Sequence, residues 1–320
     1  MIGKRGILTL LAFASLPSGA SAASPAPPAA RIVMLGTAGG AETRLRRVQS
    51  TTAVVVNGAV YLVDVGDGAL RQLVSAGLRQ EQVRAVFFTL FSQDRVGGFP
   101  NFIGTRWLML KKTPLPMYGP TGLVQTLQGI DTSLKPVAAS SFVTSKDPLE
   151  QIDAHEIVES GKVYRDENVT VTALALPRAA GKPPVAFAYR FETPGGSVVF
   201  TGATGARDTL AGFARGADVL VSEVFDIEGI VRKTGSTTPA LRERVMGHMR
   251  TNHLDPEQIG TLAKAAGVGR VVLHHLEPGL DSETPEAADR GYAAGVRGAF
   301  AGPVILPRDL QVIPLAKPAR

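Results

Sequence analysis

Residues 51–66 carry the pattern that most restricts the fold of this chain. The stretch TTAVVVNGAVYLVDVG contains two runs rich in β-branched residues, and Asn57-Gly58 separates them. An Asn-Gly pair between two apolar runs is the strongest short-range signal for a β-hairpin, because both positions accept the positive φ of a tight turn. The sequence therefore predicts an antiparallel hairpin and a fold built on β-sheets.

Strands and helices are expected in two successive rounds along the chain. The first round has strands at 31–36, 51–66 and 84–90 and a helix at 69–78. The second round begins again with strands at 163–176 and 185–202, each with a turn inside it, and at 218–225. Two rounds of this kind predict an α/β (α+β) fold, a four-layer αββα sandwich with two sheets face to face and the helices outside.

A well-marked helix precedes the last apolar strand. Asp255 is the expected N-cap, Pro256 takes the first helical position and Gln258 takes the third, which is a capping signature. The helix is expected to run to Gly267. The strand at 270–273 then brings His274 and His275 to its end.

The first 22 residues have the features of a secretory signal. Lys4 and Arg5 precede the short apolar run 7–16, and Ala20-Ser21-Ala22 is a small-residue cleavage pattern. We therefore expect a signal peptide (1–22), a flexible lead-in (23–30) and a single domain (31–320), with secreted or periplasmic localisation. A retained membrane anchor is the alternative; after cleavage no membrane partner is expected.

Composition excludes several classes of site. The chain has no cysteine, so disulfides, thiolate metal ligands and a cysteine nucleophile are ruled out. The formal net charge is +6, but the bases are scattered, and the densest group is Arg44, Arg46 and Arg47. Dispersed charge is typical of a solvated surface, so no nucleic-acid partner is expected.

Seven short motifs occur in an order that identifies a family. They are MLGTAGG (34–40), YLVDVGDGALRQL (61–73), TLFSQDRVGG (89–98), MYGP (117–120), AYRFETPGG (188–196), VVFTGAT (198–204) and VVLHHLEPG (271–279). In this order they resemble the metallo-β-lactamase superfamily, in its ribonuclease Z and arylsulfatase-like branch. The resemblance runs from about residue 31 to about residue 307 and implies the αββα metallo-β-lactamase fold.

The resemblance also implies a dinuclear zinc site, and this sequence departs from it at most ligand positions. The family loop T-H-x-H-x-D-H falls on residues 89–95, where Asp94 alone is retained. The next family histidine falls on Arg178, the bridging aspartate on Ala203, and the last histidine is retained as His275. Five of the seven positions are therefore substituted, and they are Leu90, Ser92, Arg95, Arg178 and Ala203.

Two retained ligands do not hold a catalytic zinc, which needs about three protein ligands and a water. We therefore expect no cofactor; zinc is implied by the family resemblance only, and Asp94 and His275 would be its ligands if any bound. Arg95 and Arg178 bring permanent positive charge to the site. One interpretation is a structural pair between Arg95 and Asp94, and the other is a pocket for a small anionic ligand.

The remaining candidate residues leave several functions open. Asp64 is expected to orient backbone and His275 to be structural. If a ligand binds, the candidate residues are Asp64, Asp94, Arg95, Arg178, His253 and His275. The main hypothesis is an exported pseudoenzyme or small-anion-binding protein without a catalytic residue that can be named.

Three other functions stay open as alternatives. One is a hydrolase with a single metal rebuilt from Asp94, His275, His253 and Asp64. A second is a metal-free hydrolase that uses Ser92 with His275, and a third is nucleic-acid binding, which the ribonuclease Z resemblance implies. The sequence does not decide whether the chain is an enzyme, or its oligomeric state.

Overall fold

The computed structural model describes residues 30–109, 113–142, 145, 147–176, 184–233, 235, 238–278 and 289–315. The expected signal peptide and Arg178 lie outside these residues, as does the lead-in except for Ala30, which already belongs to the first strand. Among the helices that are described, none is long and apolar enough to cross a membrane.

The first sheet has seven strands in the order β14-β1-β2-β3-β4-β5-β6. The part from β14 to β3 is antiparallel and contains the expected hairpin, and the part from β3 to β6 is parallel. The strands are β1 (Ala30–Gly36), β2 (Thr51–Val56), β3 (Ala59–Val63), β4 (Val83–Phe87), β5 (Leu115–Pro120), β6 (Ile152–Ile157) and β14 (Gln311–Pro314).

The second sheet repeats this plan with the order β13-β12-β11-β10-β9-β8-β7. Here β7 to β10 are antiparallel, and β10 to β13 are parallel. The strands are β7 (Gly161–Arg165), β8 (Thr170–Ala175), β9 (Phe187–Thr193), β10 (Gly196–Phe200), β11 (Val219–Phe225), β12 (Val271–Glu277) and β13 (Val304–Ile305).

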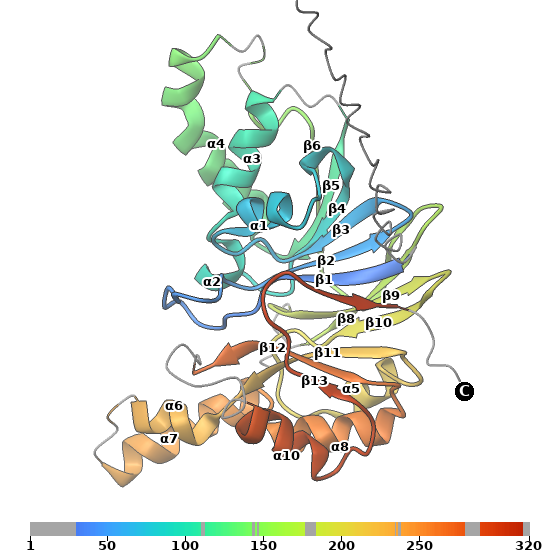
Figure 1. The fold of residues 1–320 in the computed structure, drawn as a ribbon. Helices are drawn as coiled ribbons and strands as arrows, with labels where there is room; N and C mark the ends of the chain where they lie inside the picture. The colour runs from blue at the N-terminus through green and yellow to red at the C-terminus, as the bar shows by residue number, and fades with distance from the viewer. Residues whose placement is uncertain are drawn as a thin grey trace, which may run out of the picture.

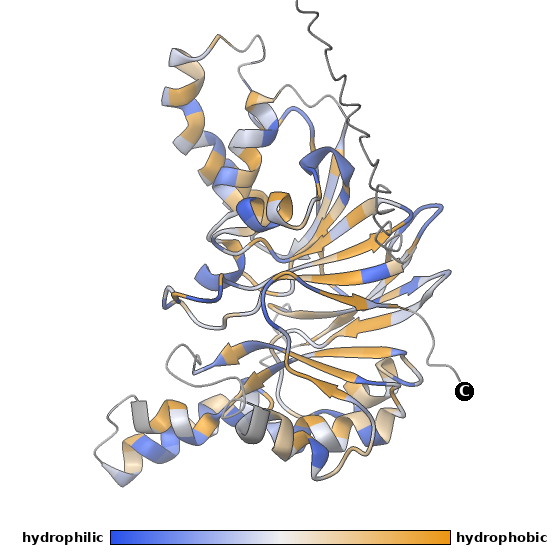
Figure 2. Ribbon diagram, in the orientation of Figure 1, coloured by the Kyte–Doolittle hydropathy of each residue, from blue (hydrophilic) through white to orange (hydrophobic). Residues whose placement is uncertain are grey.

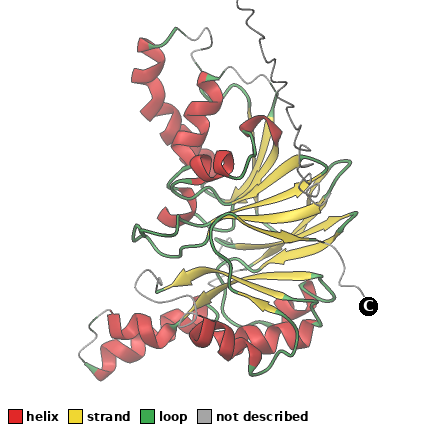
Figure 3. Ribbon diagram, viewed as in Figure 1, coloured by secondary structure: helices red, strands yellow, loops and turns green. Residues whose placement is uncertain are grey.

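Helices cover the outer face of each sheet, so that two layers of strands lie between two layers of helices (Figures 1 and 3). On the first sheet they are α1 (Ala69–Ser75), α2 (Gln93–Val96), α3 (Phe99–Leu108) and α4 (Leu123–Ser140), with a short 3₁₀ turn at Gln80–Gln82. On the second side they are α5 (Asp208–Phe213), α6 (Ile227–Lys233), α7 (Pro239–Asn252), α8 (Pro256–Ala266) and α10 (Ala294–Arg297), with a π turn at Asp289–Ala293. The α6–α7 pair extends away from the body of the molecule (Figure 1).

Aromatic side chains fill the space between the sheets, where the strands are largely hydrophobic (Figure 2). The Phe87 ring, from the first sheet, lies edge-on to Tyr189 and Phe191 of the second, with ring centroids 5.5 and 5.2 Å apart. Tyr61 and Tyr164 donate to one oxygen of Asp166 at 2.6 and 2.9 Å, which satisfies both hydroxyls at this interface. Buried aromatic pairs therefore join the two sheets.

The predicted αββα sandwich is confirmed, and two strands that lead to the site differ from expectation. The strand expected at 84–90 ends at Phe87. The strand expected at 270–273 continues to Glu277, so His274 and His275 lie inside β12 and not beyond it. The extension reflects pairing with β11, in which Glu223 is opposite His274. His275 has a positive φ of 49°, which places it outside regular strand geometry.

The capping box predicted at the start of α8 is present in the structure. The Asp255 side chain accepts from the Gln258 N–H at 2.8 Å, and the Gln258 side chain accepts from the Asp255 N–H at 3.1 Å. We expect Asp255→Ala to lower the free energy of unfolding by about 1 kcal/mol, because a helix N–H loses its acceptor. Urea unfolding measures the change, and the exposed Asp208 mutated to Ala is the control. Equal losses in the two variants would contradict the capping role.

Candidate functional site

The candidate site lies at one end of the sandwich, where strands of both sheets end or bend. Asp64 follows β3, and Arg95 lies in α2, after β4. Glu223 and His275 are contributed by the parallel strands β11 and β12 of the second sheet. Because the carboxyl ends of neighbouring parallel strands meet at one edge, residues far apart in the sequence become neighbours here.

Arg95 is the centre of this site, and its side chain is surrounded by carboxylates. The residue is only 2% exposed. Its Nη2 forms an ion pair with Glu223, its Nη1 lies 3.8 Å from Asp94, and its Nε lies 3.7 Å from Asp64. The predicted pair with Asp94 is therefore present, but Glu223 is the nearer partner.

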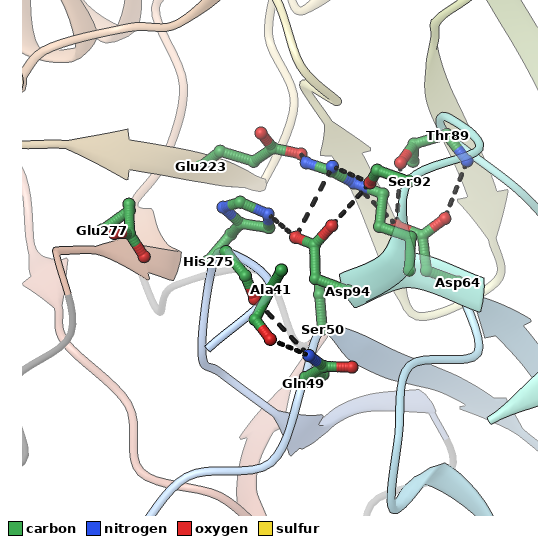
Figure 4. A network of polar contacts seen from close by, with 12 residues as sticks. Ala41, Gln49, Ser50, Asp64, Thr89, Ser92, Asp94, Glu223, His275 and Glu277 are labelled. Atoms are coloured by element: carbon green, nitrogen blue, oxygen red, sulfur yellow. Dashed lines mark hydrogen bonds and ion pairs between the residues drawn. The ribbon is translucent and has the colours of Figure 1, made fainter. Parts of the chain in front are cut away.

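Asp94 links Arg95 to the retained histidine. One carboxylate oxygen accepts the Ser92 hydroxyl at 2.6 Å, and the other lies 2.5 Å from Nε2 of His275 (Figure 4). Ser92 in turn accepts from Nη1 of Arg95 at 2.9 Å. The four side chains form one closed network of charge-assisted contacts.

Asp64 holds the loops in place, as the sequence predicted. Its two oxygens accept the N–H and the hydroxyl of Thr89, both at 2.8 Å (Figure 4). The N–H of Val65 donates to the carbonyl of Arg95 at 2.8 Å, which adds a backbone contact between the same loops. Asp64 thus ties the end of β3 to the segment that carries Asp94 and Arg95.

The charges in the site stabilise one another against burial. Burial opposes ionisation of Asp94, but the His275 hydrogen bond and the charge of Arg95 hold its pKa well below the usual value. Burial opposes ionisation of Glu223 as well, yet Arg95 and the neighbouring histidines lower its pKa to about 2. For Asp64 burial is the strongest influence and raises the pKa to about 7, against Arg95 and Thr89. Arg95 is therefore balanced by two firmly ionised carboxylates and by a third that is partly ionised near neutral pH.

The rings of His253 and His275 both lie against the Phe225 ring and do not converge on one metal position. The Phe225 ring stacks on His253 with centroids 3.8 Å apart, and it is tilted against His275 at 5.3 Å. His274 is buried, and its Nδ1 has no hydrogen-bond partner among the described residues. The ring of His253 is thus engaged with an aromatic surface, and its predicted role in ligand binding stays a prediction.

The loop between β1 and β2 covers the site from the side of β12. The N–H of Gly39 donates to Leu276, and the N–H of Leu276 donates to Thr37, at 3.2 and 3.1 Å. A Cβ atom at Gly39 would lie 2.5 Å from Nδ1 of His275, so no other residue fits there without a shift. The loop is therefore packed directly on His275.

Two substituted ligand positions are filled by apolar side chains. Ala203 is 2% exposed, and Leu90 is partly buried against the core under the second sheet. Sequence reasoning missed Glu223, although a glutamate within the apolar run VLVSEVF is a signal of an interior charge that needs a partner.

Comparisons with known proteins agree with this architecture. The Beta-lactamase superfamily domain matches residues 60–276. The chain belongs to the metallo-β-lactamase superfamily. Ribonuclease Z of Limosilactobacillus fermentum is 26% identical over 298 residues, covering 77% of this chain and 87% of the relative. Ribonuclease Z of Mycobacterium sp. (strain KMS) is 28% identical over 255 residues, covering 77% and 84%.

Solved structures of the superfamily share the fold at lower identity. The metallo-beta-lactamase fold protein YhfI from Bacillus subtilis has a TM-score of 0.66 and 18% identity, over 90% of this chain and 99% of that one. The short form of human tRNase Z has a TM-score of 0.62 and 19% identity, over 90% and 100%. Zn(2+)-bound PqqB from Methylobacterium extorquens has a TM-score of 0.60 and 17% identity, over 88% and 99%. At these identities the likeness shows the fold alone.

The residues present do not fit the dinuclear zinc site of the superfamily. Leu90, Ser92 and Arg95 stand at the histidine positions of the loop, and a guanidinium has no lone pair to offer a metal. The Arg95 side chain also occupies the space between the carboxylates that could have served as ligands. Within the described part of the chain, no group of three or more His, Asp or Glu residues is arranged to hold a metal ion.

The two hydrolase alternatives also lack support in the geometry. A metal-free mechanism needs Ser92 in contact with His275, but Asp94 stands between them and contacts both. A single metal would need His253 to converge with Asp94 and His275, whereas His253 stacks on Phe225. Arg178, the remaining substituted ligand position, lies outside the described residues.

The burial of Arg95 predicts a large loss of stability when the charge is removed. Arg95→Ala leaves buried carboxylates without their cation, which costs about 3–5 kcal/mol in the free energy of unfolding. Asp94→Ala should also be destabilising, because it removes the acceptor of Ser92 and His275. Chemical denaturation measures both, with Arg84→Ala as control, since Arg84 is exposed on β4. Losses no larger than that of the control would show that the cluster is not a buried structural unit.

The lowered pKa of the buried His274 predicts that the stability of the fold depends on pH. Burial lowers its folded pKa to about 3 from an ordinary value of 6.5, so the imidazole is neutral in the folded protein. Between about pH 6.5 and 3 the unfolded chain binds a proton there that the folded chain does not, so unfolding becomes easier by about 1.4 kcal/mol per pH unit. Above about pH 6.5 this contribution is constant. We expect His274→Gln to reduce the slope of unfolding free energy against pH between about 6.5 and 4.5; an unchanged slope would contradict it.

Proposed function

We propose that this chain is an exported pseudoenzyme of the metallo-β-lactamase superfamily, which has given up dinuclear zinc chemistry. The observation that carries the proposal is the burial of Arg95 among Asp64, Asp94 and Glu223 at the position of the lost ligands. A cation that is part of the chain lies among these carboxylates permanently, offsets part of their charge and occupies the space between them that a metal ion would need. Export rests on the signal pattern at 1–22 and is part of the proposal.

A small-anion ligand is the less favoured form of this proposal. Arg95 is buried, and its guanidinium already faces three carboxylates, so it offers no net positive charge to an incoming anion. Anion binding would therefore depend on Arg178 and on surface groups. Of the candidate ligand-binding residues, His253 and Arg178 then remain, and Arg178 lies outside the described residues.

The ribonuclease Z relatives favour a second candidate, a role in nucleic-acid binding or hydrolysis. They are 26 and 28% identical to the chain and cover 77% of it. Such a role would have to operate without the histidines that the family loop supplies. A binding assay with RNA at several salt concentrations distinguishes it, because contacts to phosphates weaken steeply as salt rises.

Metal content tests the proposal most directly. After dialysis the purified protein should hold less than one equivalent of zinc, because two retained ligands bind the ion too weakly to keep it. Elemental analysis gives the stoichiometry, and a matched assay of phosphodiester and ester hydrolysis with added zinc should give no turnover. Stoichiometric zinc that is lost in His275→Ala would overturn the proposal in favour of a rebuilt metal site.

A further inference from the structure

We propose that the cluster of Asp64, Ser92, Asp94 and Glu223 is a receptor for a guanidinium cation, and that the Arg95 side chain of the chain itself occupies it. The inference deepens the proposed function and rests on it, since the same carboxylates cannot hold a metal while a guanidinium lies between them. It assigns the site a ligand class, a planar monovalent cation with several N–H donors. In the intact protein this cation is the Arg95 guanidinium, which is covalently attached to the chain.

The acceptors are distributed around the guanidinium as such a receptor requires. Asp64 lies beside Nε, while Ser92 and Asp94 lie beside Nη1, at the distances given above. Nη2 is bound by Glu223. Nη1 and Nη2 therefore each face an acceptor, whereas Nε is buried 3.7 Å from Asp64 and has no hydrogen-bond partner among the described residues. Acceptors at both ends of the fork suit a planar guanidinium better than a compact ammonium.

The acceptors are held in place by contacts that do not involve Arg95. Asp64 is fixed by its two hydrogen bonds from Thr89. Asp94 is fixed by Ser92 and His275. For Glu223 it is the backbone that is fixed, since its N–H donates to the hydroxyl of Thr201 at 3.3 Å, and its position within β11 sets where the carboxylate starts. Asp64, Asp94 and the backbone of Glu223 therefore keep their supports when the Arg95 side chain is cut away, which favours rebinding of a small molecule.

Glu223 provides an independent observation in favour of a cation receptor. Its second oxygen, Oε2, is buried and has no hydrogen-bond partner among the described residues. The tether of Arg95 lets only Nη2 reach this carboxylate. A guanidinium without a tether could turn and bind both oxygens with two parallel N–H donors, the preferred geometry for this pair of groups.

Chemical rescue of a truncated arginine tests the receptor. In Arg95→Ala the atoms removed correspond to N-ethylguanidinium, which we would add at millimolar concentration, below any denaturing effect. The variant should melt about 6–15 °C below the parent protein, and N-ethylguanidinium should restore about 3–6 °C of this loss. The neutral isostere N-ethylurea should restore none, and neither compound should raise the melting temperature of Arg84→Ala or of the parent protein.

A second variant locates the binding. In Arg95→Ala/Glu223→Gln the receptor has lost its principal carboxylate. The concentration of N-ethylguanidinium that gives half of the maximal rescue should therefore rise at least about tenfold, which corresponds to about 1.4 kcal/mol of binding free energy. If Arg95→Ala does not fold alone, its refolding yield from urea is compared with and without each compound. The proposal predicts a higher yield with N-ethylguanidinium only.

The outcomes separate this inference from the proposed function. Equal effects of N-ethylguanidinium and N-ethylurea, or a rescue that survives Glu223→Gln, would overturn the receptor while leaving the zinc-free function of the parent chain intact. Rescue of Arg95→Ala by zinc and not by N-ethylguanidinium would likewise overturn the guanidinium assignment. Stoichiometric zinc in the undisturbed protein would instead defeat the proposed function itself.

Discussion

The buried contact between Arg95 and Glu223 is the interaction on which this end of the molecule depends. Removing a carboxylate and a guanidinium from water costs several kcal/mol each, so breaking the pair by removing one partner is strongly destabilising, because the other charge stays buried without compensation. Arg95 belongs to the first sheet's loops, and Glu223 belongs to the second sheet. The pair therefore joins the two halves of the sandwich where the aromatic core between them ends.

The other substitutions in the site are consistent with this exchange of a metal for an arginine. An arginine carries a single positive charge, whereas two zinc ions carry four, so a site neutralised by arginine tolerates fewer ionised ligands. Ala203 replaces the bridging carboxylate, and Leu90 replaces an imidazole with an apolar group that packs on the core. Ser92 provides an acceptor for Arg95 and a donor for Asp94. Of these changes, Ala203 lowers the number of buried carboxylates, and Ser92 adds a neutral hydrogen-bond partner for Arg95.

Local patterns in the sequence predicted the secondary structure and the fold, but they did not predict which side chains pair across the two sheets. The Asn57-Gly58 hairpin and the Asp255 capping box are fixed by neighbours within a few residues, and both are present. The family resemblance led to the loop at 89–95 and to His275. Glu223 could not be assigned in this way, because its partner Arg95 lies 128 residues away and the pairing arises only when the two sheets meet. The extension of β12 through His275 has the same origin, since pairing with β11 sets its length.

Asp94 stands at a family ligand position and has a structural role in this chain. In a zinc site of this family its carboxylate would be a ligand, so its presence in the sequence reads at first as a trace of metal binding. In this chain the same carboxylate accepts from Ser92, contacts His275 and lies beside Arg95. Removing Asp94 would take away the contact of the buried His275 Nε2 and the acceptor of the Ser92 hydroxyl, a loss of about 1–3 kcal/mol for a single polar group. The structural role alone is therefore sufficient to keep Asp94, and its retention is not an argument that the chain binds metal.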